Sequence, residues 1–440
     1  MRDRSNPHVV TAPPTAPGPM PEPPKLVIFN VKYSPNLGDG VIAECLEHAL
    51  RGNIPGAHIV TLDLAGRTGW SVPAAAAPRL RRLALLRRMP GWMRDVAVGA
   101  ALAFLLRFVL RRTWRRELAD ADLAIFGGGQ LIQDSDLNFP LKLAGAADEC
   151  RRLALPIAIY AVGAAPSRSP RGRRLLQRLL QAPRLMHVAA RDPQSAEELH
   201  KLGSDAVVLC RDPGLLAARL WPVRTRPARA RPLVGLGITH AALLRHHAHH
   251  DVIDGDIALA DLYVELVGDL VSAGYDVVCF SNGAAEDEAL LAVLRGRFAQ
   301  SSLPGSHVRT APRSGTPRGL AALIAGFDAV IAHRLHACVL AYSYRIPHLG
   351  LTWDRKLQAF FATVHRAKYA VPLHATTRTT IVRLLQEACR EGIDATVHAR
   401  VLSETAQAIR HLSDALVGAL GNRTMRPMAL AAGSFARGSP

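Results

Sequence analysis

The chain has 440 residues, of which 49% are hydrophobic, and a formal net charge of +18. This length exceeds one average domain, and the hydrophobic content excludes a wholly disordered chain. The basic charge favours anionic partners. However, aromatic residues make up only 5% of the chain and no nucleic-acid motif is present, so we expect an anionic substrate or an anionic membrane surface rather than nucleic acid.

The N-terminal residues 1–24 are rich in proline and are expected to be disordered. No secretory signal is visible, since the polar start is not followed by an apolar run. The six cysteines are scattered and form no CxxC pair, which favours reduced core thiols in a cytoplasmic protein.

Apolar runs separated by helical patterns predict two parallel, doubly wound α/β series. The first predicted strands are 26–31, 58–62, 123–126, 157–163, 187–190 and 206–209. The second are 233–238, 276–280, 307–310, 329–332 and 348–351, with closing helices at 377–392 and 395–418. We therefore expect two Rossmann-like domains facing a cleft, 25–221 and 233–420, with a Pro/Arg-rich linker at 222–232 and a flexible tail at 421–440.

Residues 79–118 interrupt the first domain. Eleven arginines frame an apolar run at 96–106, which is too short to cross a bilayer, since that takes ~20 residues. A basic helical pair with an apolar face suits an anionic membrane surface. The alternative is a helical insertion that packs on the domain and exposes a basic face.

The segment His333-Arg334-Leu335-His336 lies between a predicted strand and a predicted helix. Ligands of parallel α/β sheets bind at the carboxyl ends of strands, and a helix start attracts anions. Arg334 offers a planar fork of donors to a phosphate or carboxylate, and His336 can move a proton near neutral pH. The alternative is a buried Arg paired with a carboxylate and a core His.

Other polar and glycine residues follow predicted strand ends. Asp39, after Asn36-Leu37-Gly38, is expected either to handle a hydroxyl proton or to cap a helix. Gly127-Gly128-Gly129 leaves room for a ligand or makes a tight turn, and it is not a GxGxxG fingerprint.

The sequence holds three more candidate groups. Arg191-Asp192 and Arg211-Asp212 also follow strands, where each aspartate is either a site residue or a cap. Lys356 follows the strand 348–351 and is expected either to reach the anion of Arg334 or to be solvated. The histidines between His240 and His250 match no zinc-ligand spacing and indicate a mobile loop.

In this order, the motifs resemble the polysaccharide pyruvyl transferase family. The motifs that carry the resemblance are Asn36 to Asp39, Gly127 to Gly129 with Leu131-Ile132-Gln133-Asp134, Arg191-Asp192 with Ser195, Asp212-Pro213, and Arg334-Leu335-His336 with Pro347 and Lys356. The resemblance implies two Rossmann-like domains arranged as in GT-B glycosyltransferases. It also implies transfer of pyruvate from phosphoenolpyruvate to two hydroxyls of one sugar, which forms a ketal and releases phosphate.

The resemblance also suggests roles for these residues. We assign His336, Asp39 and Asp212 to catalysis; Arg334, Lys356 and Arg191 to the donor; and Asn36, Gly38, Gly127, Gly128, Gly129 and Asp192 to the acceptor. No cofactor or metal is expected, since phosphoenolpyruvate is a substrate. The acceptor is expected to be a polysaccharide or lipid-linked oligosaccharide, with the protein cytoplasmic or peripheral at the inner face of the cytoplasmic membrane. The alternatives are a glycosyltransferase that uses a nucleotide sugar and a non-catalytic scaffold for polysaccharide assembly.

Overall fold

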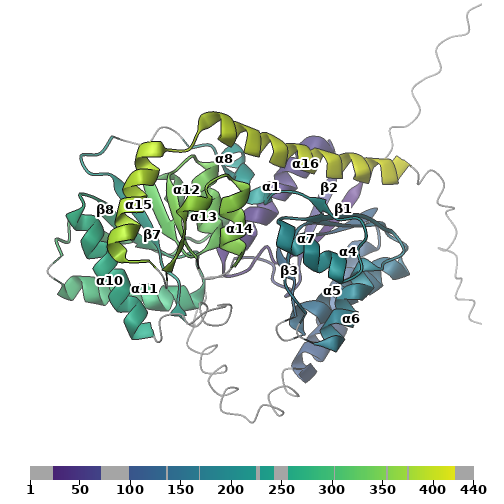
Figure 1. Cartoon of the computed structure of the whole chain (residues 1–440). Helices are drawn as coiled ribbons and strands as arrows, with labels where there is room; N and C mark the ends of the chain where they lie inside the picture. Colours follow the sequence, from purple (N-terminus) through teal and green to yellow (C-terminus); the bar gives the residue numbers. More distant parts are fainter. Residues whose placement is uncertain are drawn as a thin grey trace, which may run out of the picture.

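The computed structural model describes residues 23–70, 99–134, 137–167, 169–223, 228–241, 256–301, 303–352, 355–373 and 376–421. Two separate parallel sheets of six strands each form the centres of two α/β units (Figure 1). The expected pair of Rossmann-like domains is therefore confirmed.

The first sheet has the strand order β2-β1-β3-β4-β5-β6. Its strands are β1 (Lys25–Asn30), β2 (His58–Asp63), β3 (Leu123–Ile132), β4 (Ile157–Ala164), β5 (Leu185–Ala190) and β6 (Val208–Leu209). The helical elements are α1 (Leu37–Asn53), η1 (Leu105–Leu110), α4 (Arg111–Leu118), α5 (Asn138–Arg152), α6 (Pro170–Leu180), α7 (Pro193–Lys201), η2 (Pro213–Leu216) and α8 (Ala217–Leu220). Because β1, β3 and β4 are mainly apolar and almost entirely buried, they form the centre of this unit.

The second sheet has the order β12-β11-β10-β7-β8-β9. Its strands are β7 (Leu233–Gly237), β8 (Asp276–Phe280), β9 (Val308–Thr310), β10 (Ala329–Ala332), β11 (His348–Thr352) and β12 (Ala370–Pro372). The helical elements are α10 (Asp256–Ser272), α11 (Ala285–Gln300), α12 (Pro317–Ala325), α13 (Leu335–Ser343), α14 (Arg355–Thr363), η3 (Ala367–Tyr369), α15 (Arg378–Glu391) and α16 (Ala395–Gly421). The edge strand β12 was not predicted, because a three-residue strand next to a helix has too few residues for an apolar period.

Most predicted boundaries shift by one to three residues, and three larger differences affect the predicted site residues. The prediction ended β3 before Gly127, but the strand continues through the three glycines to Ile132 and stays paired with β4, with a register shift between Gly129 and Ile132. The turns expected at Asn36–Gly40 and around Arg334 are shorter, because α1 begins at Leu37 and α13 at Leu335. Gly38, Asp39 and His336 therefore lie in the first turns of helices.

Helices α1 and α16 join the two units. One continuous core runs from β1 and α1 into the strands and helices of the second unit. Helix α16, expected within the second unit, extends across to the first (Figure 1), where Ser413 Oγ accepts a hydrogen bond of 3.1 Å from Asn53 Nδ2 of α1.

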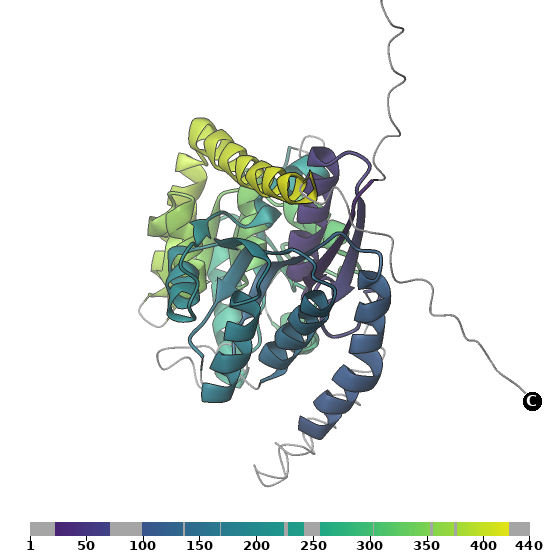
Figure 2. The same ribbon diagram turned by 90° about the vertical axis from the view of Figure 1, so that its right-hand side faces the viewer.

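Residues 99–118 form a helix on the outer side of the first unit, and it projects beyond the sheet (Figure 2). Its inner face buries Leu106, Leu110, Trp114 and Leu118, spaced every four residues.

The expectations for residues 1–22, 79–98, 224–227, 246–250 and 422–440 lie outside the described residues. Within the described ranges, no helix combines the length and hydropathy that a membrane span requires.

Candidate active site

The first turns of α1 and α13 face each other between the two units. The N–H of Leu37 donates a 2.8 Å hydrogen bond to the carbonyl of Asn282, which follows β8. A Cβ atom on Gly38 would lie 2.4 Å from His336 Cβ and 2.5 Å from His336 Nδ1. Only glycine therefore allows α1 to approach the His336 ring this closely.

His336 and Asp212 form a polar contact across the interface. Nε2 of the ring lies 3.6 Å from Oδ2 of the carboxylate, and both residues are buried. This distance is an ion-pair contact rather than a hydrogen bond. Burial alone would raise the pKa of Asp212, but His336, Arg191 and the Gly214 N–H together lower it. An ionised Asp212 therefore faces the imidazole.

Asp39 is a second carboxylate near the same ring. Burial raises the pKa of Asp39, although His336, Ser34, Arg67 and Arg334 each oppose this rise. Two carboxylates near one histidine thus have pKa values shifted in opposite directions, an arrangement typical of acid–base sites.

The glycines of β3 lie against α1. A Cβ atom on Gly128 would lie 2.5 Å from Ile42 Cγ2, and one on Gly129 would lie 3.8 Å from Asp39 Oδ1. Both residues have positive φ, 76° and 84°, a region that glycine tolerates well. The triple glycine therefore lets α1 pack directly on the sheet.

Arg334 is two residues before His336 in the chain, but its side chain contacts a different acid. Its Nε and Nη2 donate hydrogen bonds of 2.9 and 2.6 Å to Oδ2 of Asp287, in the first turn of α11. Asp287 was not among the predicted site residues.

Arg191 lies at the end of β5 and is buried. It donates a 2.9 Å hydrogen bond from Nη2 to Gln130 Oε1, and its Nη1 lies 3.8 Å from Asp212 Oδ2. Asp192 Oδ1 accepts from the Ser195 N–H at 2.7 Å and so caps α7, while its Oδ2 lies 3.5 Å from Arg191 Nε. One carboxylate oxygen of Asp192 thus caps the helix, and the other faces Arg191.

Several buried polar atoms around this contact have no hydrogen-bond partner in the described part of the chain. They are Asn36 Oδ1, Gln130 Nε2, Asp212 Oδ2 and His336 Nε2. Buried polar atoms are rarely left unpaired, so this concentration points to a ligand or ordered water between the two units.

The comparison with protein families identifies the family of this chain. The model of a family described as polysaccharide pyruvyl transferase matches residues 36–355. The chain belongs to the polysaccharide pyruvyl transferase family. The matched range begins at Asn36 and ends at Arg355, and so contains every predicted site residue except Lys356. No curated protein matched the chain.

Solved structures support the fold of this family member. It is similar to Staphylococcus aureus MnaA in a co-structure with UDP, with a TM-score of 0.52 and 11% identity over 92% of this chain and 99% of that one. It is also similar to a Listeria monocytogenes protein named as a UDP-N-acetylglucosamine 2-epimerase, with a TM-score of 0.53 and 11% identity over 92% and 98%. At this identity, the likeness confirms the GT-B-like arrangement of two Rossmann-like domains and nothing further.

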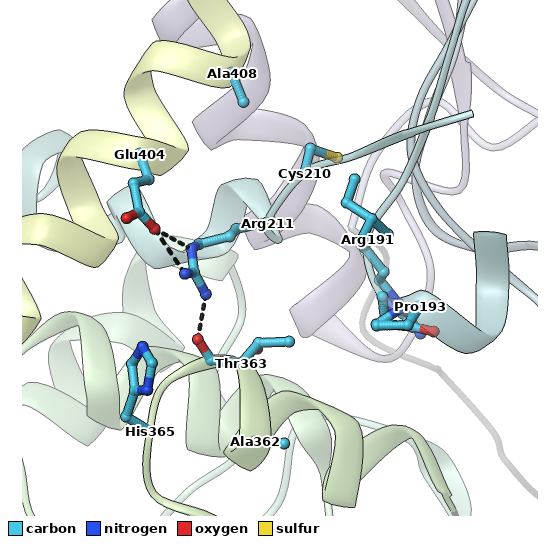
Figure 3. Close-up of a pocket in the computed structure, with 11 residues that line it drawn as sticks. Arg191, Pro193, Cys210, Arg211, Ala362, Thr363, His365, Glu404 and Ala408 are labelled. Atoms are coloured by element: carbon cyan, nitrogen blue, oxygen red, sulfur yellow. Dashed lines mark hydrogen bonds and ion pairs between the residues drawn. The ribbon is translucent and has the colours of Figure 1, made fainter. Parts of the chain in front are cut away.

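A cavity of about 370 Å³ adjoins Arg191 and Asp192 in this pyruvyl transferase family member. In Figure 3, Arg211 lies between Glu404 of α16 and the end of α14. The Nη2 atom of Arg211 is 2.7 Å from Glu404 Oε2, and Nη1 bonds the Thr363 carbonyl. Arg211 therefore connects the first unit to both helices at the wall of this cavity.

The remaining predicted residues occupy strand ends or helix starts. Asn36 precedes α1 in an extended conformation but makes no side-chain cap. Lys356 lies in the first turn of α14, after β11, which pairs with β10, and its side chain is half-buried. Asp134 accepts hydrogen bonds of 2.8 and 2.7 Å from the Ser169 N–H and Oγ, and so supports the start of α6.

Gln130 and Asp287 were not among the residues predicted from the sequence. Gln130 directly follows the triple glycine, so it could have been included with that motif. Asp287 belongs to an acidic helix start, Glu286-Asp287-Glu288, which is typical of a solvated first turn. Within the described ranges, no group of three or more His, Cys, Asp or Glu side chains is placed to hold a metal ion.

Proposed function

We propose that this protein transfers pyruvate from phosphoenolpyruvate to two hydroxyls of one saccharide, forming a ketal and releasing phosphate. The observation that carries the proposal is the contact of His336 with Gly38 and Asp212, which brings a proton donor to two carboxylates of the other domain. Family membership supports the reaction class.

The donor's charges match the basic residues at the strand ends. Phosphoenolpyruvate carries a phosphate and a carboxylate, which planar guanidinium groups bind well. Arg334 and Arg191 follow β10 and β5, and Lys356 follows β11. We assign all three residues to this anion.

His336 supplies the proton that starts the reaction. Protonation of the donor's methylene carbon by the imidazolium makes C2 electrophilic and creates the methyl group. One sugar hydroxyl then adds to C2. Departure of phosphate and addition of the second hydroxyl complete the ketal, and the two hydroxyl protons pass to the bases of the site.

Asp39 and Asp212 are the candidate bases for those hydroxyl protons. The raised pKa of Asp39 makes its carboxylate the stronger base. Asp212 is already held by the Gly214 N–H at 2.8 Å and faces His336, which suits it to orient the ring. We place the acceptor against Asn36, Gly38, Asp192 and the glycines Gly127, Gly128 and Gly129.

We further propose that the helix 99–118 contacts an anionic membrane surface that carries a lipid-linked acceptor. Phe104, Phe108 and Val109 are exposed by 62%, 43% and 45%. The exposed Arg107 lies near the Phe108 ring. Aromatic side chains beside arginine suit the headgroup region of anionic lipid. This contact would place the protein at the inner face of the cytoplasmic membrane.

The test is incubation with phosphoenolpyruvate and a panel of lipid-linked or aryl glycosides, followed by phosphate assay and mass spectrometry of the sugar. We expect phosphate release that depends on the sugar, and a product with one ketal-linked pyruvate. Transfer of a glycosyl group from a nucleotide sugar would favour the glycosyltransferase alternative. No turnover with any donor would favour a scaffold.

A further inference from the structure

The proposed function leaves the buried acid Asp287 without a role. Asp287 is fully buried, whereas its neighbours Glu286 and Glu288 in the first turn of α11 are partly exposed. A buried carboxylate is costly unless it is paired and hydrogen-bonded. Burial raises the pKa of Asp287, while Arg334 and the His240 N–H oppose this rise.

Asp287 is not the cap of its own helix. The residue before α11 is Ala284, which makes no side-chain cap. The Asp287 carboxylate instead bonds the residues after two other strands: Oδ1 accepts from the His240 N–H at 2.9 Å, and Oδ2 accepts from Arg334. It therefore links the ends of β7 and β10 to the start of α11.

The bonds to Asp287 fix the plane of the Arg334 guanidinium. Arginine has five N–H donors, and two of them, one on Nε and one on Nη2, point to Asp287, which leaves three for other partners. The Arg334 side chain is 16% exposed, so it is not sealed in the core. Its positive charge also opposes the rise in the pKa of Asp39, and it lies two residues before His336 in the chain.

A buried ion pair is weak evidence for stability, because the cost of desolvation offsets the attraction. Preorganisation of a binding group is a better reason to retain one. We propose that Asp287 is a positioning residue that holds Arg334 in the orientation that receives the anionic donor. This inference rests on the proposed function, since the anion is that of phosphoenolpyruvate.

The experiment measures phosphoenolpyruvate binding by calorimetry for the wild type, Asp287→Asn, Arg334→Ala and the double variant. Asparagine has nearly the same shape, so the fold should persist, and thermal unfolding checks this. Glu286→Gln removes the neighbouring acid and is the matched control. We expect Asp287→Asn to weaken donor binding roughly ten- to hundredfold, as small misplacements of a binding group do. The control should bind like the wild type.

The double variant should bind no more weakly than Arg334→Ala alone, because Asp287 acts only through Arg334. With saturating donor and an active acceptor, turnover of Asp287→Asn should recover most of the wild-type value. Wild-type donor affinity in Asp287→Asn, with or without a lower melting temperature, would overturn the inference and leave the proposed function intact. If the wild type does not bind phosphoenolpyruvate, the proposed function fails and this inference fails with it.

Discussion

The two polar side chains of the Arg334-Leu335-His336 motif contact acids from different domains. Arg334 is bonded by Asp287 of its own α/β unit, at 2.6 and 2.9 Å. His336 instead contacts Asp212 and Gly38 of the other unit. The orientation of Arg334 therefore depends on one domain, whereas the surroundings of His336 depend on how the two domains meet.

This difference predicts that donor binding and proton transfer can be separated. Changes within the second unit should alter donor affinity, and changes at α1 should alter turnover. The following variants test that division, in order of decreasing effect.

The largest effect is expected for His336→Gln. Loss of the proton donor should lower turnover by about 10²–10⁴-fold while donor binding persists, since general acid catalysis contributes that much. In deuterated water, the wild type should place solvent deuterium in the methyl group of the ketal. His411→Gln, on an exposed part of α16, is the control. Near-normal turnover of His336→Gln would assign the histidine a structural role.

Gly38→Ala should lower turnover through His336 without changing donor affinity. The added methyl would clash with the ring, and a misplacement of this kind lowers rates by about 10²-fold. Calorimetric donor affinity should change little, since Arg334 is held within its own unit. Gly52→Ala lies in the same helix with no atom within 4 Å of the new methyl, so it should stay active. Equal losses of donor affinity and turnover in Gly38→Ala would contradict the division.

Arg334→Lys should instead lower the affinity for the donor. Lysine cannot reproduce the planar fork, and each lost charge-assisted hydrogen bond contributes ~1.5–3 kcal/mol, so donor affinity should fall roughly ten- to hundredfold. Arg318→Lys, exposed at the start of α12, is the matched control for calorimetry. Unchanged affinity in Arg334→Lys would remove this residue from the donor site.

The pH profile tests Asp39. Because its pKa is raised above the ordinary 3.8, the rate should fall as the pH decreases through that raised pKa, where the base becomes protonated. Asp39→Asn should lose this limb of the profile together with most activity. It should also be more stable than the wild type at neutral pH, since a raised pKa means that the buried carboxylate destabilises the fold once ionised.

Glu44→Gln is the control for Asp39, because Glu44 lies in the same helix and also has a pKa raised by burial. This variant should keep the acidic limb. An unchanged limb in Asp39→Asn would assign the base to another residue, with Asp212 as the next candidate.

The smallest effect is expected for the double variant Phe104→Ser/Phe108→Ser. Its binding to vesicles that contain anionic lipid should weaken about tenfold, which corresponds to ~1.4 kcal/mol, and catalysis with a soluble acceptor should not change. Wild-type binding should weaken with salt. Ile257→Ser, a 72% exposed residue on α10, is the control. Equal binding of the wild type to neutral and anionic vesicles would favour a plain helical insertion.

The helix 99–118 also shows why sequence patterns alone were insufficient. Its arginines predicted an exposed basic face, but Arg111 and Arg115 contact Asp148 and Glu149 of α5. Only tertiary packing reveals which charges are paired. The exposed aromatic residues near its N-terminal end are likewise evident only after Trp114 and Leu118 are seen to be buried.

The sequence by itself determined the two α/β series, the segments after the strands that contain Asp39, Asp212 and His336, and the family, because apolar periodicity and short motifs are local properties of the chain. The structure alone showed that His336 lies against Gly38 and Asp212, and that Asp287 holds Arg334. These pairs are separated by 298, 124 and 47 positions, so no local pattern links them. They meet because the carboxyl ends of parallel strands converge and because α1 packs between the two units.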